Sequence, residues 1–355
     1  MNRLPLEVQT LYAELMERLS ARDARRSIGH VPGSFVTKEV KGERYAYFQY
    51  SDPGSVKRQV YVGRKDAVLD AVIARWRGER EKLAEETTGI QRLCSLLRVG
   101  GAQVTDAATA RVLKALAEAG IFHADGVLVG THAFVVIGNL LGVKWTGASL
   151  TTQDIDIAAE ASISVALPDA GADLPGVLEG LEMGFLPVPH LDARKPSTSF
   201  KVRGRGLRVD LLTPLRGRRA SGPLTLRRFN AAAQPLPFLD FLIERPVRGV
   251  IVDDGGVLVH VPDPARFGLH KLIVSGEREA TSHTKREKDL RQAAQVLSVL
   301  LEERPGDINV AWDDIVRRGK GWPRRVLESV SSLKRIDPEV GGRLAAALAP
   351  PARSA

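Results

Sequence analysis

The chain contains 355 residues, of which 44% are hydrophobic and 26% are charged, a balance typical of folded proteins with more than one domain. No apolar run approaches the roughly 20 residues that a membrane-spanning helix needs, so we expect no membrane span. Lys and Arg outnumber Asp and Glu by 51 to 42, giving a net charge of +9, which favours an anionic partner.

The first residues predict a helix rather than an export signal. Charged side chains such as Arg3, Glu7 and Glu14 interrupt the leucines of residues 1–30, whereas a signal peptide needs an uninterrupted apolar stretch. The single cysteine, Cys94, allows no internal disulfide. We therefore expect a cytoplasmic protein that begins with an N-terminal helix.

Residues 31–66 predict a small β-hairpin module. Strand-forming residues lie on both sides of an SDPGS turn at residues 51–55. Four of the five tyrosines lie in this module and are interleaved with Lys and Arg. They could form a surface on which the bases of single-stranded nucleic acid stack, or they could pack the hairpin against neighbouring helices. The sequence leaves both interpretations open.

Helical periodicity then predicts a connector over residues 67–122. It contains helices at 66–85 and 88–98 and a third helix that Thr105 caps. After it, short strand-like stretches alternate with turns, and long helical patterns return further on. The remaining domains are expected at residues 123–262 (a core with a sheet), 263–345 (a helical C-terminal domain) and 346–355 (a flexible tail).

One segment carries as much positive charge as the whole chain has in excess. Residues 194–228 contain eleven Lys or Arg and a single acid, Asp210. The basic residues are Arg194, Lys195, Lys201, Arg203, Arg205, Arg208, Arg216, Arg218, Arg219, Arg227 and Arg228. Such a cluster suits a phosphate group or an RNA backbone, and general solubility is the other explanation.

Two aspartates are separated by a single residue in the sequence TTQDIDIAAE. On a strand the side-chain period of two places Asp154 and Asp156 on one face, while Ile155 and Ile157 point into a core. Two neighbouring carboxylates repel each other unless a cation lies between them, and Mg²⁺ prefers oxygen ligands. The pair is therefore a candidate metal site.

The surrounding sequence strengthens this interpretation. Upstream, the stretch VLVGTHAFVV reads as a strand that runs into Gly130 and Thr131 and then into an apolar helix. Such a turn exposes backbone N–H groups and a hydroxyl toward a triphosphate. Downstream, Asp210 lies in another strand-like run, LRVDLLTP, from which a third carboxylate can join the first two.

These motifs resemble the nucleotidyltransferase superfamily that includes DNA polymerase β, and more closely its bacterial members of minimal, toxin-like and poorly characterised type. The pattern is a hydrophobic residue and glycine turn, a pair of acids one residue apart, and a later carboxylate on a strand. The resemblance implies an α+β protein with a polymerase β-like nucleotidyltransferase core, a mixed sheet with flanking helices. One departure is Thr131, where members usually carry Gly or Ser.

The resemblance also implies a mechanism and residue roles. Asp154, Asp156 and Asp210 would be the catalytic residues and the ligands of two Mg²⁺ or Mn²⁺ ions. An acceptor hydroxyl would attack the α-phosphate of an NTP in line, and pyrophosphate would leave. Asp210 would ligate the ion that activates the acceptor and could take its proton.

Further residues are candidates for contacts with the nucleotide, in addition to Gly130 and Thr131. Arg203 and Arg208, expected on one strand with Asp210, could stabilise charge on the phosphoryl oxygens. Lys271, in FGLHKLIVS, stands where related folds place a triphosphate contact. His132 and His270 are interpreted as structural histidines, and no spacing of His or Cys predicts a zinc site.

The helix expected at residues 285–302 carries two charge pairs at i,i+4 spacing. These are Lys285 with Asp289 and Glu287 with Arg291. Pairs of this kind describe a solvated helix face, and the sequence therefore assigns these residues to the surface.

The predicted function is metal-dependent transfer of an NMP from an NTP to an acceptor. A hydroxyl of RNA, for example a tRNA end, or of a protein is favoured over a small cationic molecule, because few acids surround the site. The alternative is a catalytically silent nucleic-acid-binding protein or toxin–antitoxin partner with the same fold. A third interpretation is a phosphohydrolase that uses the same carboxylates.

Overall fold

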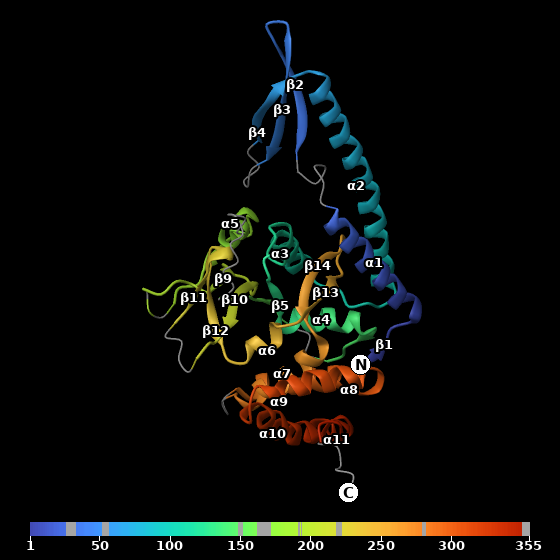
Figure 1. Ribbon diagram of the computed structural model, residues 1–355, viewed down its shortest axis with the longest axis vertical. Coiled ribbons are helices and arrows are strands. Elements are labelled where there is room, and N and C mark those ends of the chain that lie inside the picture. The colour runs from blue at the N-terminus through green and yellow to red at the C-terminus, as the bar shows by residue number, and fades with distance from the viewer. Residues whose placement is uncertain are drawn as a thin grey trace.

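The computed structural model describes residues 1–25, 33–51, 57–147, 152–161, 172–190, 192, 194–217, 222–278 and 282–349. The expected turn at residues 52–55, Arg218 and Arg219 of the basic segment, and residues 350–355 of the expected tail lie outside these residues. The protein is of the α+β class, with a central sheet, helices around it and a smaller sheet at the far end of a long helix (Figure 1).

The elements follow one another in a mixed order. The helices are α1 (Leu6–Ala24), α2 (Ala67–Val99), α3 (Ala107–Glu118), α4 (Gly130–Leu140), α5 (Leu174–Gly180), α6 (Leu239–Ile243), α7 (Pro264–Gly276), α8 (His283–Glu303), α9 (Pro305–Arg317), α10 (Gly321–Ile336) and α11 (Pro338–Ala347). The strands are β1 (Asn2–Arg3), β2 (Ser34–Val40), β3 (Glu43–Ser51), β4 (Lys57–Arg64), β5 (Val127–Val129), β6 (Val143–Lys144), β7 (Asp154–Ala158), β8 (Phe185–Pro187), β9 (Ser199–Val202), β10 (Arg208–Pro214), β11 (Leu224–Leu226), β12 (Ala231–Leu236), β13 (Pro246–Ile251) and β14 (Val257–Pro262). No helix in the described part of the chain is both long and apolar enough to cross a membrane.

The central sheet is mixed. Its strand order is β11-β12-β10-β7-β5, and the β8-β9 pair joins it along the first half of β10. β10 runs parallel to β7 and β12, whereas β5 runs antiparallel to β7. On one face of β7 and β10, Ile155, Ile157, Val209 and Leu211 are fully buried. The alternation of apolar and polar residues therefore fixes which face of the sheet is left for polar side chains.

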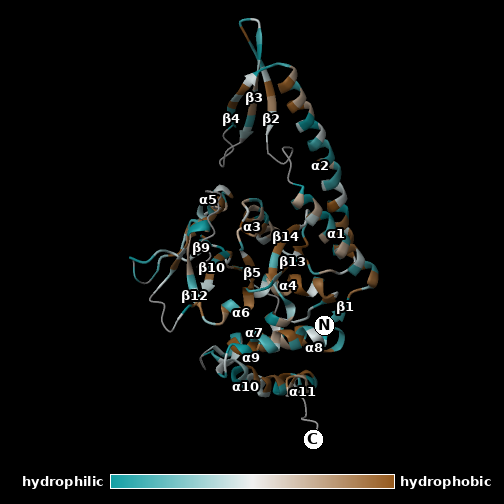
Figure 2. Cartoon of the chain, in the orientation of Figure 1, coloured by the Kyte–Doolittle hydropathy of each residue, from teal (hydrophilic) through white to brown (hydrophobic). Residues whose placement is uncertain are grey.

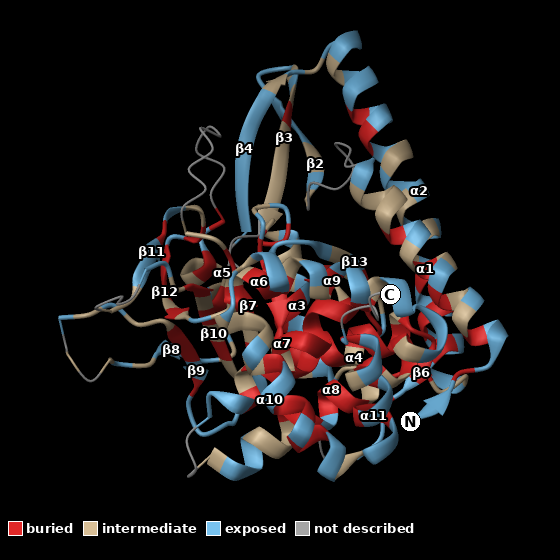
Figure 3. Ribbon diagram, turned by 60° about the horizontal axis from the view of Figure 1, so that its bottom comes forward, coloured by how far each residue is buried: buried red, intermediate tan, exposed pale blue. Residues whose placement is uncertain are grey.

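The C-terminal helices α7 to α11 pack below the sheet (Figure 1). Buried Arg266 of α7 links them to the rest of the protein, because its guanidinium donates to the carbonyl of Phe241, to Glu244 and to Asp314 of α9. Figure 3 shows the buried residues of α7 and α8 at the centre of the molecule. The core therefore extends without a break from the sheet into these helices.

The connector differs from its prediction at α2, which is one helix instead of two. The break between the two expected helices was predicted at residues 86–87, in a stretch that contains Thr87, Thr88 and Gly89. The hydroxyls of both threonines donate to carbonyls four residues back, those of Leu83 and Ala84, and this bonding is compatible with a continuing helix. Gly89 lies against the guanidinium of Arg18 of α1, which would have to shift to make room for a larger side chain.

The N-cap of α3 is Asp106 rather than Thr105. The carboxylate of Asp106 accepts a hydrogen bond from the backbone N–H of Thr109, and a carboxylate is as good a capping group as a hydroxyl. Thr105 instead uses its backbone N–H to bind the carbonyl of Val252.

The expected hairpin module is a three-stranded antiparallel sheet, because residues 34–40 pair with residues 43–49 of β3. Phe35 and Phe48 lie on the face toward α2, where both rings meet Trp76 edge to face at 5.4 and 6.1 Å. These three residues attach the sheet to the helix. The tyrosines at 45, 47 and 61 do not, since the strand period places them on the other face.

Candidate active site

Three carboxylates lie on one face of the central sheet. β7 and β10 are parallel neighbours, with Asp156 opposite Asp210 and Asp154 opposite Arg208. Directly opposite residues of neighbouring strands point to the same face, so Asp154, Asp156, Asp210 and Arg208 share it. The residues that alternate with them along β7 and β10 point to the other face and are buried in the core. This packing holds the two strands in their register.

The turn from β5 into α4 lies directly against Asp156. Val129, the last residue of β5, is opposite Asp156 in the sheet, and Gly130 follows with a φ of +69°. A Cβ on Gly130 would overlap with Oδ2 of Asp156. Glycine is therefore required twice here, for its backbone conformation and for the absence of a side chain.

Asp156 has an unusual environment for a carboxylate. Burial, together with the negative charges of Asp210 and Asp154, raises the pKa of Asp156 to about 7, although the charges of Lys271 and Arg208 oppose the change. The site therefore contains more negative charge than its own cations neutralise.

Asp210 is held by two neighbours. Its Oδ1 accepts a hydrogen bond from the hydroxyl of Ser199 and one of 2.7 Å from Nε of Arg208. The same Nε lies 2.7 Å from the Ser199 hydroxyl. These contacts fix the rotamer of Asp210.

Ser199 and the turn that follows it were not expected from the sequence. Ser199 lies opposite Asp210 on β9, and Lys201 lies opposite Arg208. The expectation that Arg203 and Arg208 share a strand is wrong, because the chain turns between them and Gly204 has a φ of +73°. The RGRG sequence was the available signal for this hairpin.

Lys271 and two unexpected residues, Lys288 and Asp289, approach the carboxylates from α7 and α8. The side chain of Lys271 is 14% exposed, and its ammonium lies 2.7 Å from Oδ1 of Asp289. Burial alone would raise the pKa of Asp289, but the charges of Lys271 and Arg278 outweigh it and lower that pKa. Lys271 thus forms an ion pair with Asp289, although its positive charge still lowers the pKa of Asp156.

Of the two surface ion pairs expected on α8, only one is present. Glu287 and Arg291 form the i,i+4 ion pair at 2.6 Å. Asp289, by contrast, is buried and pairs with Lys271 and Arg278 rather than with Lys285. Sequence spacing could not reveal this, because the competing cations come from α7 and from the segment between the two helices.

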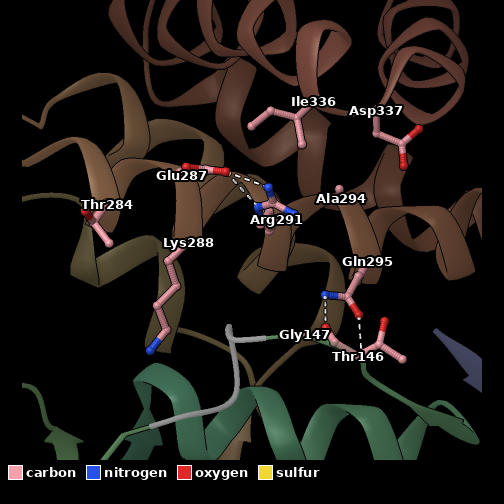
Figure 4. Close-up of a pocket in the computed structure, with 10 residues that line it drawn as sticks. All are labelled: Thr146, Gly147, Thr284, Glu287, Lys288, Arg291, Ala294, Gln295, Ile336 and Asp337. Atoms are coloured by element: carbon pink, nitrogen blue, oxygen red, sulfur yellow. Dashed lines mark hydrogen bonds and ion pairs between the residues drawn. The ribbon is translucent and has the colours of Figure 1, made fainter.

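A hollow of about 640 Å³ lies beside the site, between α8, the start of α11 and the segment after β6. Thr146 and Gly147 form one wall, and Figure 4 shows Lys288 extending from α8 away from the Glu287–Arg291 pair. Burial and the charge of Lys271 lower the pKa of Lys288, whereas Asp289, Asp154 and Asp156 oppose that change. Lys288 thus lines the hollow and is also within electrostatic reach of Asp154 and Asp156.

A second, shallower hollow of about 370 Å³ lies at the β8-β9 edge of the sheet. It is lined by Leu186, Pro187, Val188, Pro189, Lys201, Val202, Arg203 and Gly204. Leu186 lies opposite Lys201, which in turn lies opposite Arg208. The hollow thus continues the carboxylate face outward across β9.

Two other expected residues are buried. Thr131 is the second residue of α4 and exposes 7% of its surface, so little of its side chain is available to a phosphate. Burial lowers the pKa of His132 to about 4 and that of His270 to about 3, and both side chains are therefore neutral near pH 7. Within the described residues, neither ring nitrogen of His270 has a hydrogen-bond partner, which differs from the satisfied histidine that we expected.

The donors on the carboxylate face suit a hard divalent cation. All three are carboxylates, the ligands that Mg²⁺ and Mn²⁺ prefer, and the pKa of Asp156 is raised by burial and then by the charges of Asp210 and Asp154, which a cation would offset. As the side chains stand, no three His, Cys, Asp or Glu of the described residues are gathered closely enough to hold a metal ion. Asp210 contacts Arg208 instead.

Comparisons with known proteins give a match at the level of the family. A family model described as a nucleotidyltransferase matches residues 107–317, which is more than half of the chain. Among solved structures, an antigenic nucleotidyltransferase-like protein from Paracoccidioides brasiliensis is similar at 10% identity and a TM-score of 0.36, with 69% of this chain and 95% of that chain covered. No curated protein matches the chain.

Proposed function

The chain belongs to the nucleotidyltransferase family, and from this premise we propose that it transfers an NMP from an NTP to an acceptor hydroxyl in a metal-dependent reaction. The observation that carries the proposal is the shared face of Asp154, Asp156 and Asp210 beside the Gly130 turn. The core would then be of the polymerase β-like type.

All three carboxylates bind metal in this proposal, and Asp210 has a second role as the proton acceptor. Asp154, Asp156 and Asp210 would hold Mg²⁺ or Mn²⁺, which when bound stabilises negative charge on the phosphoryl oxygens. The acceptor oxygen forms a bond to the α-phosphorus, the bond to the bridging oxygen breaks, and pyrophosphate leaves with the electron pair. Asp210 accepts the acceptor's proton, and Arg208 orients Asp210.

The nucleotide is proposed to bind on the side of Lys288. The hollow of about 640 Å³ there is large enough for a nucleotide, and Lys271 and Lys288 place positive charge between it and the carboxylates. Backbone N–H groups at the start of α4 add donors for a phosphate.

The acceptor is proposed to approach from the opposite side, across β9. Asp210 lies on that side of Asp156 in the sheet, and the hollow of about 370 Å³ offers apolar side chains together with Lys201 and Arg203. This combination suits the end of an RNA chain, although a protein hydroxyl remains the second acceptor class. A protein that binds nucleic acid without turnover is the alternative function, which the Arg208–Asp210 ion pair favours because it occupies one carboxylate.

The test is a labelling experiment with each α-³²P-NTP, Mg²⁺ or Mn²⁺, and total RNA or cell lysate as acceptor. We expect label on an acceptor with the natural protein and none with the Asp154→Ala/Asp156→Ala double variant. Loss of NTP without labelled acceptor would indicate a phosphohydrolase. If no NTP is consumed while RNA binding persists in EDTA, the protein is the silent binding protein instead.

Lys288→Met is expected to raise the KM for NTP at least about tenfold, because a hydrogen bond to a charged group is worth roughly 1.5–3 kcal/mol. Lys285→Met is the matched control, since this lysine is exposed on the same helix. Steady-state kinetics at saturating acceptor give both values. Equal KM values for the two variants would remove Lys288 from the nucleotide site.

A further inference from the structure

Three tyrosines form a continuous group on the outer face of the β2-β3-β4 sheet. The ring centroids of Tyr47 and Tyr61 are 5.6 Å apart, and those of Tyr45 and Tyr61 are 6.1 Å apart. Tyr47 and Tyr61 are also direct cross-strand neighbours. We call this group the tyrosine face.

The tyrosine face is not needed to attach the sheet to the rest of the protein. Phe35, Phe48 and Trp76 do this on the opposite face. Tyr61 exposes 55% of its surface, and β4 is exposed along its length (Figure 3). In Figure 1 the sheet stands apart from the core, at the far end of α2. Aromatic rings of this size are costly to expose to water, which points to a ligand.

Positive charge surrounds the rings. The ammonium of Lys38 lies over the ring of Tyr47, 4.8 Å from its centroid. The strands contain two acids, Glu39 and Glu43, and Glu43 pairs with Arg64. By the strand register Lys38, Lys57 and Arg64 share the face of the tyrosines. The other basic residues of the sheet are Lys41 in the β2-β3 turn and, on the opposite face, Arg44 and Arg58. An anionic ligand with flat apolar groups matches both features.

We propose that the tyrosine face binds single-stranded nucleic acid, with bases stacked on Tyr47 and Tyr61 and phosphates contacted by Lys38 and its basic neighbours. Every base presents a flat π-face, while a positively charged surface follows the backbone. The site lies outside residues 107–317, to which the family assignment refers. It is therefore a binding function in addition to the proposed transfer, and it does not depend on it.

The experiment measures fluorescence anisotropy of labelled 15-nucleotide oligo(U) and oligo(dT) with the full chain, in EDTA and without NTP. Tyr61→Ala is expected to weaken binding about 5- to 100-fold, since stacking is worth roughly 1–3 kcal/mol per base. Tyr61→Phe keeps the ring and should bind nearly as the natural protein does. Lys38→Gln should flatten the dependence of affinity on salt, because one phosphate contact is lost.

The matched control is Val60→Ala. Val60 is the preceding residue on the same strand and is 52% exposed, but it points to the other face, so binding should not change. Thermal unfolding of each variant checks that the sheet remains folded.

Several outcomes would overturn the proposal. Binding that Tyr61→Ala and Tyr47→Ala leave unchanged would belong to the basic segment of residues 194–228 instead. Equally tight binding of a double-stranded RNA would exclude stacking on bases, and no binding of either oligonucleotide would leave a protein partner as the occupant. The Asp154→Ala/Asp156→Ala variant should bind normally, so that failure of transfer and failure of this proposal are separate results.

Discussion

Asp156→Asn is expected to remove at least about 99% of the transfer activity and, in metal-free protein at pH 8, to raise the melting temperature by roughly 2 °C or more. Activity falls because one of the metal ligands is lost, and even the outer partners of such ligands typically matter 10- to 100-fold. Stability rises because the ionised carboxylate of Asp156 is buried and is also repelled by Asp210 and Asp154.

The stability gain should depend on pH in a defined way. The pKa of Asp156 is raised to about 7 in the folded protein, above its ordinary value. Between the ordinary pKa of 3.8 and about pH 7 the folded state keeps a proton that the unfolded chain has lost, so the penalty builds up across this range and is complete above about pH 7. Near pH 4, where Asp156 is largely protonated in the folded state and the penalty has hardly begun to build up, the natural protein and Asp156→Asn should melt at similar temperatures.

Calorimetry in EDTA at both pH values, together with the labelling assay, checks this prediction. Asp254→Asn is the control, because Asp254 is 87% exposed and pairs with Arg98 at the β13-β14 turn. It should change neither quantity. Full activity of Asp156→Asn, or a melting temperature that falls at pH 8, would contradict the assigned role.

Gly130→Ala is the second change with a large expected effect. The added Cβ would overlap with Asp156, and alanine at a φ of +69° costs a further 1–2 kcal/mol, approximately. We expect a stability loss of about 2 kcal/mol or more and a loss of activity of at least about a hundredfold, because displacement of a reacting group by about 1 Å can alone have that effect.

Gly120→Ala separates the two causes. Gly120 also has a positive φ, +84°, but a Cβ there would meet nothing. This variant should show the backbone cost in its melting temperature and retain its activity. If Gly130→Ala were as active as Gly120→Ala, the contact with Asp156 would not matter for catalysis.

Local patterns predicted the elements of the carboxylate face. The period of a strand placed Asp154 and Asp156 on one side, and the glycine after a strand indicated the turn into α4. The register that sets Asp156 opposite Asp210 could not be predicted, because it depends on pairing between segments 54 residues apart in the chain.

Partners contributed by other elements were the main source of error. Lys271 was expected at a phosphate, but the sequence does not show that Asp289 comes to lie 2.7 Å from it. The role of the tyrosines could not be predicted for the same reason, because composition does not show which face of a sheet a helix will cover. Phe35, Phe48 and Trp76 cover it here, and only the structure reveals that choice.

The long helix α2 has a geometric consequence. Its buried residues are Ile73 and Trp76, near the small sheet, and a second group that begins at Ile90. Residues 77–89 between them are all described, and none of them is buried. This middle part is hydrophilic (Figure 2). At 1.5 Å per residue its 33 residues span about 50 Å. Adding or deleting seven residues within residues 77–89 would shift the small sheet by about 10 Å and rotate it by only about 20°. The helix is thus a spacer of adjustable length, and insertions or deletions there can change the reach of the protein without altering either of its surfaces.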